Sequence, residues 1–195
     1  MKKRIIVVED ESIVRLDVSL MLKDAGYEVV AEAADGEKAI ELAYSLKPDL
    51  MIMDIKMPKL NGLKASEIIS NKFNIPILLL TAYSQKEYIE KAKKANILGY
   101  LVKPISEANL IPAVEIALKQ AENAILYKEK VEEMNRELKN RKIVEKAKGI
   151  LMKQLNLPEE KAYNKIRDLS MKKQMPLEKV AKYIILKYPS EYTSE

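Results

Sequence analysis

Short apolar runs alternate with stretches of helical spacing through the first 120 residues, and no other feature of the sequence constrains the fold as strongly. The apolar runs, rich in Ile, Val, Leu and Met, predict five strands at residues 5–8, 29–31, 50–53, 77–80 and 100–102. Between the first two runs, apolar residues recur at helical spacing, as at Ile13, Leu16 and Leu20. Alternation of this kind builds a parallel sheet with helices on both faces. We therefore predict an α/β fold with a five-stranded, doubly wound parallel sheet.

The chain contains neither Cys nor His. Disulfides, thiolate nucleophiles, cysteine zinc sites and imidazole-based catalytic triads are therefore excluded from it. The first apolar run is too short for a signal peptide, and no segment approaches the roughly 20 apolar residues that span a bilayer. We expect a cytoplasmic protein without a membrane partner, whose chemistry uses carboxylates, hydroxyls, lysines and a hard cation.

Polar side chains follow the predicted strands at their carboxyl ends, where open α/β sheets bind ligands. Glu9 and Asp10 follow the first strand, and Asp54 follows the third. Thr81 and Lys103 follow the fourth and the fifth. Carboxylates that lie close together repel one another unless a cation neutralises them, and their oxygens suit an ion such as Mg²⁺. A carboxylate in such a site can attack a phosphoryl group, so Asp54 is the predicted nucleophile.

Four motifs in these residues resemble the receiver domain of two-component response regulators. They are VVEDE, LMIMDIKMP followed by NG, LLLTA and GYLVKP, in the order and rough spacing of that family. The resemblance covers about residues 3–120, and we place a receiver domain at residues 1–120. It implies a flavodoxin-like fold and a sensor histidine kinase as the partner that phosphorylates Asp54. It also implies that the protein is not an enzyme, because a receiver catalyses only its own phosphorylation and dephosphorylation.

The resemblance assigns the acidic residues to a pocket that holds Mg²⁺. Glu9 and Asp10 form the acidic pocket in this reading. Asp10, Asp54 and the main-chain carbonyl of Lys56 are the expected ligands of the ion. Glu9 stands where Asp is also common in the family, and this difference leaves the charge of the pocket unchanged.

The resemblance also implies how phosphorylation is sensed. Thr81 and Lys103 would contact the phosphoryl oxygens, and Tyr100 would turn into the space that Thr81 leaves. The surface of the fourth helix, the fifth strand and the fifth helix would then change shape. The alternative for Tyr100 is an ordinary surface tyrosine. The peptide bond between Lys103 and Pro104 is expected to be cis.

Helical spacing continues after Pro104 almost to Asn156, with Pro112 as an early interruption. Within it, positions that step by three and four form a short, imperfect heptad seam of Ala117, Gln120, Ala124, Tyr127, Val131, Met134 and Leu138. We predict a helical linker at residues 117–140 that forms a coiled-coil dimer stem. Because the seam is weak, a homodimer would form only when phosphorylated receivers favour it. The alternative is a monomeric helix that lies on its own domain.

The second half of the chain is basic. Residues 1–115 carry a net charge of −1 and residues 116–195 carry +6, with 14 basic and 5 acidic side chains between Lys139 and Lys187. This excess indicates a polyanion partner such as nucleic acid. A lysine-coated, solvated helix surface is the alternative.

Three helices are predicted from residue 141 onward, in a small three-helix bundle. Pro158 and Pro176, each followed by acidic residues, predict the starts of the second and third. The first of these helices is the end of the long one. Four of its lysines fall within an arc of about 60° around the helix axis, namely Lys139, Lys142, Lys146 and Lys153. Gly149 lies beside this arc, although glycine inside a helix costs about 1 kcal/mol relative to Ala. Either close approach of a nucleic-acid backbone or packing of a neighbouring helix would explain it.

The segments IVEKAKGILMKQLNLPEEKAY and MPLEKVAKYII resemble the ANTAR domain, an RNA-binding antitermination module, over about residues 135–190. The resemblance implies a regulator that, when phosphorylated, dimerises and binds stem-loop RNA in a leader transcript to prevent transcription termination. Pro158 departs from the pattern, which often has a Ser that could cap the helix. The predicted RNA-binding residues are Lys139, Lys142, Lys146, Lys148, Gly149, Lys153, Lys165, Arg167, Lys172 and Lys173.

Two other output functions remain open for this tail. It could bind DNA as a helix-turn-helix, or it could serve as a protein adaptor that never contacts nucleic acid. DNA readers usually carry a recognition helix rich in Arg, Asn and Gln. The last predicted helix offers lysines and apolar residues instead, so the sequence favours RNA over DNA.

Overall fold

The computed structural model of the chain describes residues 2–82 and 97–188. The chain divides into two compact units, Met1–Ile125 and Leu126–Glu195, which we describe separately. The fourth helix that the sequence analysis expects before the fifth strand lies outside the described residues.

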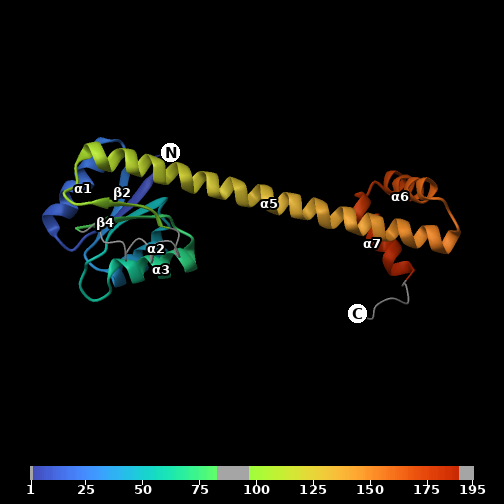
Figure 1. Cartoon of the computed structure of the whole chain (residues 1–195), viewed down its shortest axis with the longest axis horizontal. Helices are drawn as coiled ribbons and strands as arrows, with labels where there is room; N and C mark the ends of the chain where they lie inside the picture. The colour runs from blue at the N-terminus through green and yellow to red at the C-terminus, as the bar shows by residue number, and fades with distance from the viewer. Residues whose placement is uncertain (1, 83–96, 189–195) are drawn as a thin grey trace. The chain divides into compact units, whose positions relative to one another are not determined.

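The first unit contains a five-stranded parallel sheet with the strand order β2-β1-β3-β4-β5 (Figure 1). Its strands are β1 (Arg4–Val8), β2 (Glu28–Ala33), β3 (Leu50–Asp54), β4 (Ile77–Thr81) and β5 (Ile97–Val102). Every predicted strand lies within an observed one, so the predicted α/β fold is confirmed. The order places β1 and β3, which carry the predicted acidic residues, side by side.

Helices cover both faces of this sheet. They are α1 (Ser12–Asp24), α2 (Gly36–Leu46), α3 (Gly62–Phe73) and the first part of α5 (Glu107–Leu155). Figure 1 shows α2 and α3 on one side of the sheet and the start of α5 on the other. The arrangement is the doubly wound one that strand–helix alternation predicts.

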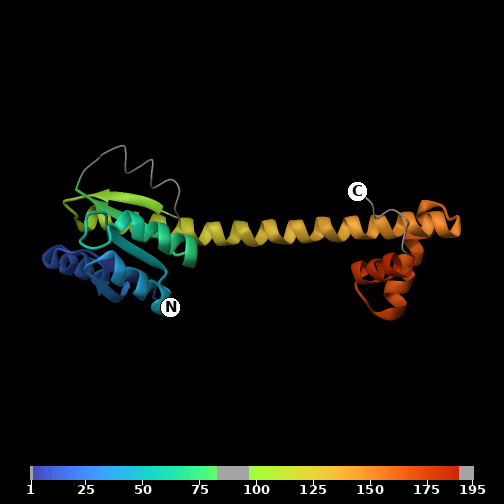
Figure 2. The same ribbon diagram turned by 90° about the horizontal axis from the view of Figure 1, so that it is seen from below.

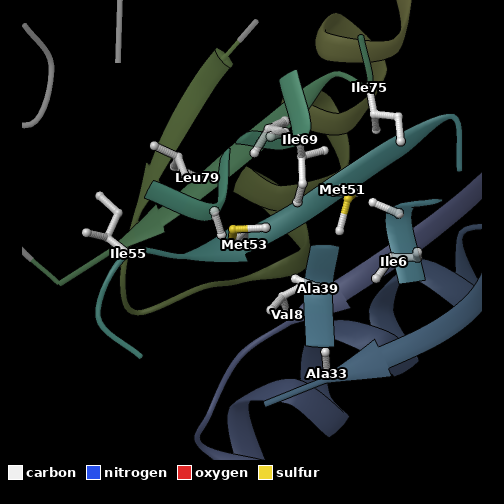
Figure 3. Packing of buried hydrophobic residues seen from close by; sticks show 13 residues of the cluster. Ile6, Val8, Ala33, Ala39, Met51, Met53, Ile55, Ile69, Ile75 and Leu79 are labelled. Carbon is white, nitrogen blue, oxygen red and sulfur yellow. The ribbon is translucent and has the colours of Figure 1, made fainter. Parts of the chain in front are cut away.

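Alternate residues of the three central strands, β1, β3 and β4, enter two separate cores. In β1, Ile6 and Val8 pack in the core beneath α2 and α3, while Ile5 and Val7 pack in the core beneath α1 and α5. All four side chains are fully buried. Figure 3 shows the first core, where Met51 of β3 lies among side chains of neighbouring elements. Burial on both faces explains why the sequences of these strands are continuous apolar runs.

A close approach of backbone to backbone fixes the loop after β3. Asn61 caps α3 by accepting a hydrogen bond from the main-chain N of Lys64 at 2.9 Å. The main-chain N of Gly62 donates to the carbonyl of Ile55 at 3.0 Å. A Cβ atom on Gly62 would lie 1.8 Å from the carbonyl oxygen of Asp54. Only glycine therefore fits beside the residue that is the predicted phosphoacceptor.

The second unit is a small helical bundle with one core. Figures 1 and 2 show α6 (Glu159–Lys173) and α7 (Leu177–Lys187) beside the last turns of α5. The buried side chains come from all three helices and are Val144, Ala147, Ile150, Leu151, Ala162, Ile166, Val180, Ala181 and Ile184. The predicted three-helix bundle is confirmed.

Both short helices of the bundle begin directly after a proline. Pro158 and Pro176 occupy the N-cap positions, and neither supplies a side-chain cap. Acidic residues stand in the first turns instead, Glu159 and Glu160 in α6 and Glu178 in α7. Their charges interact favourably with the positive end of each helix dipole, so they offset part of what a capping Ser would contribute.

Helix α5 continues through Pro112, as predicted, but the first position of the heptad seam differs from the prediction. Ala117 is 1% exposed and packs in the receiver core with Leu118 and Val114. It therefore cannot contribute to a dimer stem. Heptad spacing continues from Gln120 to Leu138, and all six of these seam positions are exposed.

Among the helices in residues 2–82 and 97–188, none combines the length and the apolar character that a membrane crossing requires.

We predict that Gly62→Ala lowers the free energy of unfolding of the first unit by about 1–3 kcal/mol, since the added methyl group meets the backbone of Asp54. Chemical denaturation followed by circular dichroism measures the change. Gly99→Ala is the matched control, because its Cβ would meet only the flexible side-chain end of Leu78 at 3.3 Å. Equal effects of the two substitutions would contradict the proposed close fit at Gly62.

Candidate functional site

Three carboxylates meet at the carboxyl ends of β1 and β3. Glu9 and Asp10 follow β1, and Asp54 is the last residue of β3. Each residue offers one carboxylate oxygen, and these three atoms all lie within 4.8 Å of one another. Glu9 and Asp54 are buried, whereas Asp10 is exposed. The sheet order therefore brings together the acidic residues that the sequence analysis selected.

Lys103 bridges two of these carboxylates from the end of β5. Its Nζ lies 2.7 Å from Oε2 and 2.9 Å from Oε1 of Glu9, and 3.3 Å from Oδ2 of Asp54. The contact with Oε1 is a hydrogen bond, while that with Oε2 is an ion pair without hydrogen-bond geometry. The following peptide bond to Pro104 is cis, as expected. The Lys103 side chain is mostly buried, so its charge is directed into the site.

Burial and neighbouring charge have opposite effects on the pKa values of Glu9, Asp54 and Lys103. Burial raises the pKa of Glu9 and of Asp54, although Lys103 acts to lower both. Burial by itself would lower the pKa of Lys103, but the hydrogen bond to Glu9 and the charge of Asp54 outweigh it and raise that pKa. Lys103 therefore stays protonated, and its single positive charge faces more than one carboxylate.

These residues fit a divalent cation. Three carboxylates around one ammonium group leave negative charge uncompensated, and their oxygens are near enough to share one ion. Asp10 and Asp54 are the predicted side-chain ligands. Lys56, whose main-chain carbonyl is the third predicted ligand, is exposed two residues after Asp54.

Thr81 and Tyr100 lie on the neighbouring strands. Thr81 ends β4 and is 6% exposed, and its carbonyl accepts a hydrogen bond from the main-chain N of Lys103 at 2.8 Å. Tyr100 lies on β5 and is 47% exposed. Because about half of the Tyr100 side chain is exposed, an inward turn of this predicted switch residue would bury more of it.

Arg15 is a residue of the site that the sequence analysis missed. From α1 its guanidinium donates to the main-chain carbonyl of Glu9 at 2.5 Å and contacts that of Asp10 at 3.4 Å. Its Nε also lies 3.5 Å from the carboxylate of Glu32 in β2. Arg15 therefore anchors the loop that carries the acidic pocket. Its place one turn into the helix after VVEDE is the only sequence signal for this role.

The predicted RNA-binding residues differ in how far the structure leaves them available. Those with exposed or partly exposed side chains are Lys139, Lys142, Lys146, Lys153, Lys165, Arg167, Lys172 and Lys173. Lys148 is only 12% exposed, and its Nζ lies 2.5 Å from Glu145 and 2.7 Å from Glu159. Those hydrogen bonds raise the pKa of Lys148 and link α5 to the start of α6. We therefore interpret Lys148 as a structural residue of the bundle.

Gly149 faces open space within the described chain. Apart from its chain neighbours and the backbone of its own helix, no atom would lie within 4 Å of a Cβ at this position. Packing of a neighbouring helix of the same chain, one of the two explanations left open by the sequence, therefore does not account for the glycine.

Comparison with known proteins identifies both units. The family model described as the response regulator receiver domain matches residues 5–115, and that of the ANTAR domain matches residues 132–185. The transcriptional regulatory protein PdtaR of Mycobacterium tuberculosis is 39% identical over 183 residues, which cover 94% of this chain and 89% of that protein. The chemotaxis protein CheY of Thermotoga maritima is 36% identical over 58% of this chain and 96% of its own length.

Solved structures resemble the chain over about the extent of the receiver. A two-component response regulator of the LuxR family from Aurantimonas matches with a TM-score of 0.58 and 33% identity, over 62% of this chain and 87% of that one. The response regulator domain of Thermotoga maritima CheB matches with a TM-score of 0.56 and 29% identity, over 63% of this chain and 98% of that one.

We predict that Asp10→Asn raises the dissociation constant for Mg²⁺ about tenfold or more, because it removes a charged oxygen ligand from the cluster. A Mg²⁺ titration followed by the amide signal of Ile55 measures the constant. Glu11→Gln, at the exposed next position, should change it by less than about twofold. Unchanged affinity in Asp10→Asn would place the ion elsewhere.

Proposed function

Because the chain belongs to the response regulators and joins a receiver domain to an ANTAR domain, we propose that phosphorylation of Asp54 controls RNA binding. A sensor histidine kinase would phosphorylate Asp54, two copies would then pair, and the dimer would bind stem-loop RNA in a leader transcript. Bound RNA would avoid the terminator structure, so transcription would continue. One observation carries this proposal: the acidic cluster around Lys103 and the basic bundle belong to one chain.

The contacts of Asp54 support the proposed transfer of a phosphoryl group to its carboxylate. Oδ1 of Asp54 accepts a hydrogen bond from the main-chain N of Ile55 at 2.8 Å, which holds the carboxylate in place. A carboxylate oxygen attacks the phosphorus of the kinase phosphohistidine, the new P–O bond forms, and the P–N bond breaks as its electron pair leaves with the imidazole. Mg²⁺ held by Asp10, Asp54 and the carbonyl of Lys56 would supply positive charge near the phosphoryl oxygens.

The new phosphoryl group changes the charge that Lys103 and Thr81 face. It carries nearly two negative charges in place of the single charge of the Asp54 carboxylate, which already lies 3.3 Å from Lys103 Nζ. Lys103 would pair with a phosphoryl oxygen, and the Thr81 hydroxyl would move towards another. Tyr100 would turn inward behind Thr81, so that the surface around β5 would change its shape.

The exposed seam of α5 supports pairing of two chains. We place the dimer stem within residues 117–140 and begin its seam at Gln120, because Ala117 is buried. Tyr127, Val131 and Leu138 are each more than half exposed in the single chain. A second copy would cover them, while Gln120 keeps the seam weak. A small gain in free energy from phosphorylated receivers could then decide between monomer and dimer.

The basic bundle suits RNA with unpaired loop bases. Lys142 and Lys146 are exposed one turn apart on α5, and Gly149 presents backbone without a side chain close by. Lysines can bind phosphates along the RNA backbone, but double-helical RNA hides its base edges in a deep groove. Loop bases are therefore the proposed source of specificity. A dimer offers one bundle to each of two loops, and tethering raises the effective concentration of the second contact.

Asp54→Asn should abolish labelling by a small-molecule phosphodonor in Mg²⁺, because an amide cannot form the acyl phosphate. The parent chain should be labelled and should increase in mass from monomer towards dimer in light scattering, whereas Asp54→Asn should stay unlabelled and unchanged in mass. Label that survives in Asp54→Asn would move the acceptor to another residue.

Lys142→Glu combined with Lys146→Glu should weaken hairpin RNA binding. It should also reduce the magnitude of the log–log salt slope by about one for each phosphate that a lysine no longer neutralises. Phosphorylation should be unaffected. Lys23→Glu combined with Lys72→Glu makes the same charge change on exposed helices of the receiver and serves as control. Equal affinities of the two double variants would place the RNA on another face. Absence of RNA binding by the parent chain at every salt concentration would favour a protein adaptor.

Gly149→Ala should have opposite effects on folding and binding. The bundle should gain about 1 kcal/mol of stability, because alanine is the better helix former and its methyl group meets open space. RNA affinity should fall if the RNA backbone approaches this position closely. Thermal unfolding and a filter-binding titration measure the two effects. A variant that is more stable and binds RNA as well as its parent would remove Gly149 from the interface.

A further inference from the structure

Helix α7 presents an exposed aromatic side chain that the core of the bundle does not use. Tyr183 is 50% exposed, whereas Val180, Ala181 and Ile184 of the same helix are buried in the core. Tyr188, the next aromatic residue along the chain, packs against that core. The ring of Tyr183 is therefore half exposed and is not part of the buried core of the bundle.

A lysine of the neighbouring helix lies over this ring. Nζ of Lys173, at the end of α6, lies 5.1 Å from the centroid of the Tyr183 ring. A cation over the face of an aromatic ring is attracted to it. The contact places a positive charge on the face of the ring where α6 ends, shortly before α7 begins.

The surroundings of Tyr183 are positive. Lys179 and Lys187 stand four residues before and after it on α7, and Lys182 precedes it directly; the side chains of all three are exposed or partly exposed. Glu178 is the one acidic residue of α7. At 100° per residue it lies about 140° around the helix from Tyr183, so it does not neutralise this face.

This combination of groups matches the chemistry of a flexible nucleic acid. Aromatic rings stack on bases, at about 1–3 kcal/mol per base, while lysines bind the phosphates on either side. Bases of a hairpin loop are free to stack in this way, whereas those within a double helix are not. An acidic peptide would use the lysines but would leave the ring without a stacking partner, so the aromatic group favours RNA.

We propose that Tyr183 and Lys173 form a stacking site for one unpaired base of the RNA, with the lysines of α7 binding adjacent phosphates. Lys173 is itself exposed, so it can release the ring to bind a phosphate when a base arrives. The inference rests on the proposed function, and it adds α7 to an interface predicted from α5 and α6 alone.

The test uses the full phosphorylated chain and a labelled hairpin RNA that this chain has selected from a random pool. Tyr183→Ala should weaken binding about 5- to 150-fold. Tyr183→Phe, which keeps the ring, should bind within about twofold of the parent. Tyr44→Ala removes an exposed tyrosine of the receiver and should leave RNA affinity unchanged.

Abasic substitutions through the loop provide a second measurement that does not depend on one variant folding well. One abasic position should weaken binding by the parent and by Tyr183→Phe, yet have little further effect on Tyr183→Ala, because the two changes remove the same interaction. Unchanged affinity of a folded Tyr183→Ala, or additive losses at every loop position, would overturn the stacking site while leaving RNA binding established. Failure of the selection to yield any RNA would instead remove the proposed function itself.

Discussion

The ammonium group of Lys103 holds the receiver site together. It lies within 3.3 Å of Glu9 and Asp54, two buried acidic residues at the ends of adjacent strands. Without it, two carboxylates taken out of water would face each other with no compensating charge. With it, the site still carries excess negative charge beside Asp10, which explains its fit to a divalent cation and supports its proposed response to a phosphoryl group.

The proposed action of a charge change at Asp54 on the rest of the chain depends on a rigid sheet and a weak stem. The strand ends are fixed by fully buried cores on both faces and by the close approach of Gly62, so the proposed mechanism assigns the response to added charge to Thr81 and Lys103. The stem seam has the opposite character, since most of its apolar side chains are exposed and Gln120 interrupts it. Such a seam responds to small differences in free energy.

The sequence predicted the fold and the acidic cluster well, because both depend on features that a linear pattern records. Strands buried on both faces must be apolar throughout, and parallel strands bring their carboxyl ends, including Asp54, to one edge. Contacts between side chains that lie apart in the sequence are not recorded in this way. Heptad spacing did not reveal that Ala117 faces its own receiver, and charge did not reveal that Lys148 pairs with Glu159, eleven residues away. The anchoring contacts of Arg15 were missed for the same reason.

The central claim is that phosphorylation of Asp54 makes two chains dimerise and that the dimer binds RNA. Comparing RNAs with one and two hairpin loops tests it most directly. Their affinities for the full chain are measured with and without phosphodonor. Tethering predicts that the phosphorylated chain favours the two-loop RNA by about a hundredfold or more, and that the unphosphorylated chain shows little preference. The same ratio in both states would contradict the claim.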